Sequence, residues 1–287
     1  MNKTKTSAII LAVLVVVSLS VNVYLASQNS TLNSEKSAYT AKVDMVATLA
    51  EAQTSTDSEL QRIGESLIYA SKQLSTSGIS GSQANEILNA LASNSTYIIN
   101  AATENLDNAI VAAAPADWSY IIGRNVGEQT HLNPNPHGEI TPVMTPLVPV
   151  QSDMMANIMA APVFDGDREL IGYISVIFDP ARLLNDTISA ALAGTSYTTT
   201  VMQVDGLMIY DTDQLQQYKN MFTDPAYANY TQLILLGRHV SQYSSGYGTY
   251  QFTIDAASPI IINKECYWTT VSAYGQQWRI ALQHSIS

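Results

Sequence analysis

Hydrophobic and polar residues follow three patterns along this chain, and each predicts a different kind of structure. Residues 7–26 are almost all apolar, residues 29–75 are polar with apolar positions at helical spacing, and residues from 97 onward form short strand-like runs separated by turn residues. Helices repeat about every 3.6 residues and strands about every two, so the change of period marks a change of structure. The sequence therefore predicts a helical part followed by an antiparallel-sheet part.

The helical stripe falls mostly on the a and d positions of one heptad frame: Val46, Leu49, Leu60, Ile63, Leu67, Ala70 and Leu74. No proline occurs before residue 115, and Ser77-Gly78 gives a stop signal, so we predict one long helix that ends there. Gln53 and Thr56 interrupt the frame. The stripe either packs on the following domain or forms the seam of a dimer.

Two sets of strand-like runs follow the stripe with the same order of elements. The first set begins with a hairpin predicted at residues 97–103 and 109–114, with a turn over residues 104–108. A short helix at residues 83–93 precedes this hairpin, and a polar crossing at residues 115–139 follows it. Three strands complete the set, at residues 141–150, 154–164 and 169–178.

The second set is organised around residues 201–213, a predicted hairpin whose Asp205-Gly206 turn is a strong short-range signal. A crossing with the sequence FTDPAY follows, and three strands are predicted at residues 247–253, 265–273 and 278–283. Between the sets, residues 180–192 are typical of a linking helix, with Pro180 near its start and Gly194 past its end. A hairpin, a crossing and three strands form a PAS-like unit, so we predict an α+β fold with two such units in tandem.

The apolar block at residues 7–26 is long enough to cross a membrane, since about twenty helical residues span roughly 30 Å. Lys3 and Lys5 precede it, which favours a cytoplasmic N-terminus and an extracytoplasmic bulk. The alternative is a cleaved signal peptide, for which Tyr24 and Leu25 make a poor cleavage site. We predict an uncleaved, single-pass cell-membrane anchor.

Composition favours an outer-surface protein and argues against a nucleic-acid binder. The formal net charge is −11, and the 13 basic residues less Lys3 and Lys5 leave 11 against 24 acidic residues after the apolar block. No basic cluster is present to neutralise phosphates. Cys266 is the only cysteine, so there is no disulfide framework, and we expect it to be a small core residue.

Several segments resemble double Cache sensor domains, the PAS-like extracytoplasmic domains of membrane receptors, and are similar to those common in methanogenic archaea. The resemblance runs from about residue 28 to the C-terminus. It is carried by PVFDGDRELIGYISVIFDP, VMQVDGLMIYDTD, NMFTDPAY, SGYGTYQF and KECYWTTVSAYGQQWRIAL. The resemblance implies binding of a small molecule, often an amino acid or carboxylate, usually in the membrane-distal unit, and transmission of that event through the long helix.

The resemblance divides the chain into five parts: a cytoplasmic stub and anchor (1–27), a stalk helix and short helix (28–96), a membrane-distal unit (97–180), a linking helix (181–196) and a membrane-proximal unit (197–287). The family's amino-acid-binding pattern has an arginine followed two residues later by Trp and Tyr. Here Trp118 and Tyr120 precede Arg124, so that specificity does not carry over. No output domain follows the last predicted strand, so a separate signalling protein is expected.

The distal crossing holds the best binding candidates, because flat apolar faces and donors suit a small anionic or zwitterionic ligand: Trp118, Tyr120, Arg124, Gln129 and His131. Arg124 is equally well interpreted as a surface charge. Thr145 opens the next strand and can line the same pocket. In the proximal unit the candidates are Tyr210, which also suits the core, and Asp211, which is expected to pair with Arg238 or with a ligand amine.

Catalysis and metal binding find no support in the sequence. It contains no nucleophile elbow, Walker loop or dinucleotide fingerprint, and paired carboxylates such as Asp211/Asp213 lie at turns, where they usually bond the local backbone. His131, His137 and Glu139 form a loop cluster whose spacing matches no metal motif. We predict no enzyme activity, no metal and no cofactor.

The leading hypothesis is a membrane-anchored extracytoplasmic sensor that binds a small molecule and relays binding to a partner. Homodimer formation through the stalk helix is a further expectation. The alternative is a structural or adhesive surface protein that uses the Cache fold without a ligand. A closed pocket lined by Arg124 and aromatic side chains favours sensing, whereas a distal unit filled by its own side chains favours structure.

Overall fold

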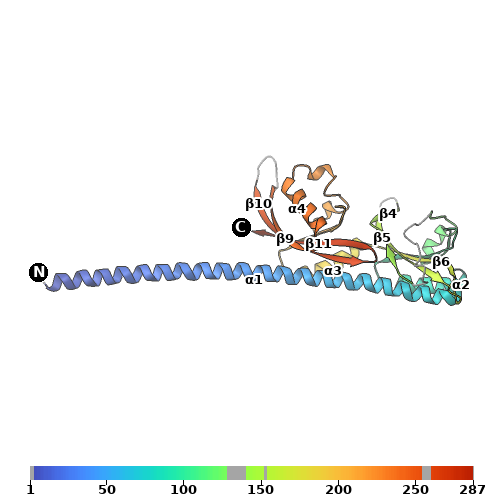
Figure 1. Ribbon diagram of the computed structural model, residues 1–287, viewed down its shortest axis with the longest axis horizontal. Coiled ribbons are helices and arrows are strands. Elements are labelled where there is room, and N and C mark those ends of the chain that lie inside the picture. Colours follow the sequence, from blue (N-terminus) through green and yellow to red (C-terminus); the bar gives the residue numbers. More distant parts are fainter. Residues whose placement is uncertain (1–2, 128–139, 152–153, 254–259, 287) are drawn as a thin grey trace. The chain divides into compact units, whose positions relative to one another are not determined.

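The computed structural model describes residues 3–127, 140–151, 154–253 and 260–286, with side chains from residue 22 onward in those ranges apart from 151, 252 and 253. The chain divides into two compact units, Met1–Ala47 and Thr48–Ser287. The first is helical, and the second contains two sheets together with the other described helices (Figure 1).

Helix α1 (Lys3–Ser77) confirms the predicted long helix and its end. Gly78 has a φ of +78°, a conformation that favours glycine, and its N–H donates to the Leu74 carbonyl at 2.9 Å. Within the part of the chain that the structure describes, no helix has the length and hydrophobicity to span a membrane. Side chains are described only from residue 22, so most side chains of the anchor expected at residues 7–26 lie outside the described part.

The apolar stripe of α1 is a packing face. Leu60, Ile63, Leu67 and Leu74 have no exposed surface within Thr48–Ser287, so the first of the two interpretations is confirmed for this stretch. Side chains buried inside one chain cannot also form a seam with a second chain. A dimer contact along the stalk would need other positions of the helix.

The two polar residues that interrupt the heptad frame make specific bonds to other elements. Gln53 Nε2 donates to the carbonyl of Thr270 at 2.9 Å. The Thr56 hydroxyl is fully buried and lies 3.0 Å from the hydroxyl of Thr187. Buried polar groups need partners. The breaks in the apolar pattern therefore mark the points where α1 forms hydrogen bonds with other elements instead of apolar contacts.

The first sheet is antiparallel, with strand order β2-β1-β6-β5-β3 and with β4 also paired to β5. Its strands are β1 (Ile98–Glu104), β2 (Ile110–Ala114), β3 (Val143–Met144), β4 (Val148–Gln151), β5 (Met154–Phe164) and β6 (Leu170–Phe178). Helix α2 (Gly81–Ser93) packs on β1 and β2, and the 3-10 helix η1 (Ala116–Ile121) opens the crossing. Most of the predicted elements are confirmed within two residues.

One predicted strand, residues 141–150, is wrong as a single element, because it divides into β3 and β4. Pro146 lies at the break and has no N–H to donate to a neighbouring strand. The next N–H, that of Leu147, donates to Gln203 Oε1 at 2.6 Å, and Gln203 belongs to the second sheet. The segment therefore bonds the two sheets together instead of extending the first one.

The second sheet repeats the strand order of the first, as β8-β7-β11-β10-β9. Its strands are β7 (Thr198–Gln203), β8 (Met208–Asp211), β9 (Gly246–Thr253), β10 (Ile261–Ala273) and β11 (Gln276–Ile286). Helix α3 (Pro180–Leu192) has the predicted bounds. The crossing contains η3 (Gln214–Gln216), η4 (Pro225–Tyr227) and α4 (Thr231–Gln242), which packs on β9 and β11 (Figure 1).

The predicted hairpin turn between β7 and β8 also fixes the crossing. Gly206 has a φ of +90°, and a Cβ at this position would come within 2.4 Å of the Phe222 ring. Asp205 Oδ1 accepts from the Leu207 N–H at 3.0 Å, which closes the turn. Glycine is therefore required both for the backbone conformation and for the close approach of the crossing.

Substitution of Leu67 by alanine should lower the free energy of unfolding by about 2–5 kcal/mol, because the leucine is fully buried in the α1 face. The matched control is Leu106→Ala, whose side chain is 57% exposed, and it should change stability by less than about 0.5 kcal/mol. Urea unfolding of both variants provides the measurement. Equal losses in the two variants would contradict the packing role of the stripe.

Candidate functional site

One face of the second sheet and the crossing above it form a partly open cavity of about 350 Å³. This volume lies at the lower end of the range for small-molecule pockets. Side chains alternate between the faces of a strand, so the strand residues that line the cavity come from one face of the sheet. The residues that line it are Thr198, Thr200, Met208, Asp211, Thr212, Asp213, Gln216, Lys219, Met221, Ala226, Tyr227, Tyr230, Leu233, Tyr250, Lys264 and Gln283.

Asp211 ends β8 and places a carboxylate in this cavity. Its Oδ2 accepts from the Thr200 hydroxyl at 2.5 Å, and its Oδ1 accepts from the Asp213 N–H at 2.8 Å. Thr200 lies directly across the strand pair from Asp211, which fixes the first of these bonds. The carboxylate is therefore held in one orientation by both the sheet and the turn that follows it.

A chain of donors ends on this carboxylate. The Tyr250 hydroxyl donates to Gln283 Oε1 at 2.7 Å, and Gln283 Nε2 donates to Thr200 Oγ1 at 3.0 Å. Thr200 in turn donates to Asp211. The chain joins strands β9, β11, β7 and β8, so the sheet positions every member, and aligned bonds of this kind strengthen one another.

Burial raises the pKa of Asp211 from 3.8 to about 6. The bonds from Thr200 and from the Asp213 N–H oppose this increase, and Lys264 opposes it least. Desolvation penalises the charged form of a carboxyl group, which is why burial dominates. The protein therefore keeps a carboxylate where its ionisation is unfavourable.

The walls of the cavity are aromatic. Tyr227 and Tyr250 are both buried, and burial raises the pKa of each hydroxyl above its ordinary value. Tyr227 donates to Gln216 Oε1 at 2.6 Å. Both hydroxyls are thus neutral and already bonded, and they contribute shape rather than charge.

Below the cavity lies a smaller apolar space of about 20 Å³, lined in part by Cys266. Cys266 is buried, as expected of a small core residue, and desolvation raises the pKa of its thiol to about 12. A neutral buried thiol is unreactive. This residue therefore belongs to the core beneath the site.

Arg279 on β11 holds the helix that covers the cavity. Its Nε and Nη2 donate to the carbonyls of Val240 and Ser241 at 3.0 and 3.2 Å, near the C-terminal end of α4. Its Nη1 donates to the Thr270 hydroxyl at 2.9 Å. A cation at a helix C-terminus satisfies free carbonyls and complements the helix dipole. Arg279 thus fixes α4 on the sheet.

The candidates of the first crossing form a stack near the surface. The Trp118 and Tyr120 rings have centroids 5.8 Å apart, and the Arg124 guanidinium carbon lies 5.2 Å from the Tyr120 centroid. Tyr120 is 52% exposed, and Arg124 is also exposed. Gln129 and His131 lie outside the described residues, so the structure brings together three of the five candidates.

The remaining predicted site residues lie in different surroundings. Thr145 is buried and structural, because its Oγ1 accepts from the Ile158 N–H at 3.0 Å and its carbonyl accepts from Asn157 Nδ2 at 2.8 Å. Tyr210 is buried next to Asp211 in β8, on the face of the sheet away from the cavity. Of these candidates, only Asp211 faces the cavity.

The expected pair of Asp211 with Arg238 is not found among the described contacts. The Arg238 guanidinium carbon lies 4.7 Å from the Phe222 ring centroid instead. Arg238 is on the exposed side of α4, whereas Asp211 faces inward from the sheet. Asp211 and Arg238 therefore belong to neighbouring elements, but their side chains point to different sides.

Sequence reasoning missed a buried carboxylate in the first sheet. Glu104 was expected in a turn, but it is the last residue of β1 and is 4% exposed. Its Oε1 accepts from the Ser175 hydroxyl at 3.0 Å, and burial raises its pKa. The signal in the sequence was weak, because the same residue suits a turn as well as a strand end.

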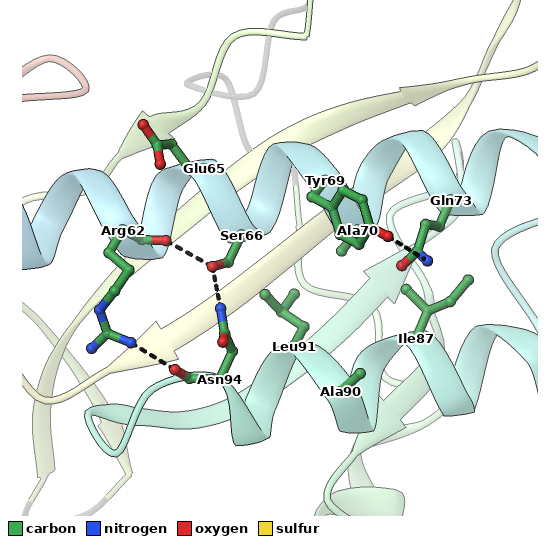
Figure 2. Close-up of a pocket in the computed structure, with 10 residues that line it drawn as sticks. All are labelled: Arg62, Glu65, Ser66, Tyr69, Ala70, Gln73, Ile87, Ala90, Leu91 and Asn94. Carbon is green, nitrogen blue, oxygen red and sulfur yellow. Dashed lines mark hydrogen bonds between the residues drawn. The ribbon is translucent and has the colours of Figure 1, made fainter.

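Figure 2 shows a second hollow, a groove of about 410 Å³ between α1 and α2. Its polar groups bond one another: Arg62 Nη1 donates to the Asn94 carbonyl at 2.7 Å, and Asn94 Nδ2 donates to Ser66 Oγ. The remaining lining is largely apolar, including Ile87 and Leu91. The groove therefore offers few free polar groups and is a weaker candidate than the second-sheet cavity.

Comparison with known proteins agrees with this architecture. The chain matches the family described as HK/GC/chemotaxis protein-like, sensor domain over residues 58–180, which is less than half of its length. An extracellular ligand binding receptor from Desulfohalobium retbaense is 26% identical, with a TM-score of 0.64 over 82% of this chain. This chain spans only 40% of that receptor. No curated protein matches the chain.

Two further structures share the fold at lower identity. The ligand-binding domain of the Campylobacter jejuni chemoreceptor Tlp3, in complex with 4-methylisoleucine, is 10% identical with a TM-score of 0.59 over 85% of this chain and 91% of that one. The ligand-binding domain of the Pseudomonas fluorescens chemoreceptor CtaA, in complex with L-serine, is 13% identical with a TM-score of 0.56 over 88% and 98%. The predicted resemblance to extracytoplasmic sensor domains is confirmed, and the likeness to sensors of methanogenic archaea stays a prediction.

Replacement of Arg279 by lysine should lower the free energy of unfolding by about 2–4 kcal/mol, because a single ammonium cannot reach all the carbonyls that the guanidinium bonds. Arg238→Lys is the control, since its guanidinium is exposed over a ring, and it should lower stability by less than about 1 kcal/mol. Thermal unfolding compares the two. A loss for Arg279→Lys no larger than that of the control would contradict the role of Arg279 in holding α4.

Replacement of Asp211 by asparagine should stabilise the empty protein at pH 8. The pKa of Asp211 is raised to about 6 from 3.8, so its contribution to stability is complete below about pH 4 and is lost as the pH rises through 6. Removing the carboxylate should add at most about 3 kcal/mol at pH 8 and little at pH 4. Denaturant unfolding at both pH values is the measurement. A variant that is less stable at pH 8 than at pH 4, relative to the parent, would contradict this account.

Proposed function

We propose that this chain is the extracytoplasmic, ligand-binding part of a membrane-anchored sensor, and that its ligand occupies the cavity of the second sheet. The observation that carries the proposal is the half-buried carboxylate of Asp211 in a cavity of about 350 Å³, oriented by a chain of hydrogen bonds. An ionised carboxylate in such a place costs stability unless something compensates its charge, so its presence needs a reason. A ligand that compensates the charge supplies the reason.

A bonded path connects the cavity to the long helix and supports a relay. Arg279 holds α4, which covers the cavity, and also donates to the Thr270 hydroxyl at 2.9 Å. The carbonyl of Thr270 accepts from Gln53 of α1, and Gln53 Oε1 accepts from the Thr269 hydroxyl at 3.0 Å. Movement of α4 on ligand binding would thus be transmitted through β10 to α1.

The membrane anchor and the signalling partner in this proposal are inferred from the sequence. Residues 7–26 would anchor the chain in the cell membrane with the N-terminus in the cytoplasm, and α1 would carry the signal toward that anchor. A separate signalling protein would read the shift of the helix, either from one chain or from a homodimer. The named neighbours are parts of receptors, which supports an output in a partner rather than catalysis in this chain.

Thermal unfolding of the full chain against amino acids, carboxylates, amines and purines tests this function. A ligand at a hundredfold excess over its Kd should add about 2.7 kcal/mol to the stability of the folded state, which is a clear rise in melting temperature. Gln53→Leu serves as the matched variant, since it should keep the ligand-induced rise while breaking the bond to β10. The absence of any ligand-induced rise across the panel would favour the structural or adhesive alternative.

A further inference from the structure

Asp211 is a polar group of the second-sheet cavity with hydrogen-bond capacity to spare. A carboxylate offers about four acceptor positions, and those of Asp211 receive only the Thr200 hydroxyl and the Asp213 N–H. Among the described residues, no cationic nitrogen lies within the 4.0 Å of a salt bridge to this carboxylate. The site therefore presents unfilled acceptors together with a negative charge that no described cation contacts directly, although Lys264 acts on it from a distance.

The tyrosine and glutamine donors next to Asp211 are already used within the protein. Tyr250 donates to Gln283, Gln283 donates to Thr200, and Tyr227 donates to Gln216. Rearrangement of this network would break bonds between buried groups, which costs more than the bonds gained. A ligand must therefore bring its own donors to Asp211.

We propose that the cavity binds its ligand through an ammonium group, with Asp211 as the counter-ion and the tyrosines as the surrounding wall. This inference rests on the proposed function and names the ligand class for the same site. An ammonium group supplies up to three donors and one positive charge, and its bond to a carboxylate is among the stronger hydrogen bonds in proteins. Tyrosine rings add favourable surroundings for a cation.

Other ligand classes fit the site less well. A ligand carboxylate or phosphate beside Asp211 would bring two negative charges together, which disfavours the charged state of both. A neutral hydroxyl would supply a donor but leave the buried charge uncompensated. Lys219 and Lys264 also line the cavity, so a plain amine and an amino acid share the ammonium chemistry and differ only in whether a second group reaches a lysine.

The test uses three four-carbon probes that differ in their charged end groups. Butylamine carries an ammonium group, butyrate carries a carboxylate, and 4-aminobutyrate carries both. Ligand-observed NMR with the full chain at pH 7.5 should show binding of an ammonium probe with a Kd in about the millimolar range, as expected for molecules of this size, and none of butyrate. Asp211→Asn should weaken that binding at least about tenfold, because one partner of a buried charge pair is lost. The control Asp205→Asn, in the turn of the same hairpin and outside the cavity lining, should retain the parental affinity within about threefold.

The outcomes separate the possibilities. Tighter binding of 4-aminobutyrate than of butylamine identifies an amino acid class, and the reverse identifies a plain amine; both support the inference. Binding of butyrate, parental affinity in Asp211→Asn, or no binding of either ammonium probe at tens of millimolar overturns it. A ligand from the broader thermal panel that still binds Asp211→Asn would leave the sensor function standing and remove only the ammonium assignment. Melting temperatures of both variants show that each is folded.

Discussion

The buried face of α1 is the constraint on which the arrangement of residues 48–287 depends. Leu60, Ile63, Leu67 and Leu74 have no exposed surface, and Gln53 bonds β10 where the apolar pattern is interrupted. A sheet has two faces to cover, and the described helices α1 and α3 lie on one side of the second sheet while α4 covers the other (Figure 1). Because α1 and α3 hold the strands from one side, the cavity can form on the other side, under α4.

The side of the sheet under α4 carries a residue that costs stability. A sheet face filled by apolar residues would be more stable than one that carries Asp211, and the raised pKa of this residue reports the cost. The hydrogen bonds from Tyr250 through Gln283 and Thr200 limit the cost without removing it, because they supply donors but no positive charge. An arrangement of this kind is expected where a ligand completes the electrostatics of the site.

Much of the fold could be predicted because it depends on local signals. The Asp205-Gly206 turn, the Ser77-Gly78 stop and the bounds of α3 are all encoded within a few residues. The division of residues 141–150 depends only partly on a local signal, Pro146, because Leu147 also bonds Gln203, a residue far along the chain. For the same reason the sequence favoured the first crossing as the site: it contains an aromatic and arginine cluster, whereas the partners of Asp211 come from separate strands.

Hydrogen–deuterium exchange of the full chain, with and without a saturating ammonium probe, tests the central claim that the ligand site lies in the second sheet. We predict slower exchange in β8 and in the crossing from residue 212 to residue 242, where the cavity and its covering helix lie. Exchange in β1, β2 and η1 should be the same with and without the probe. Protection confined to residues 98–127 would contradict the account and move the site to the first sheet.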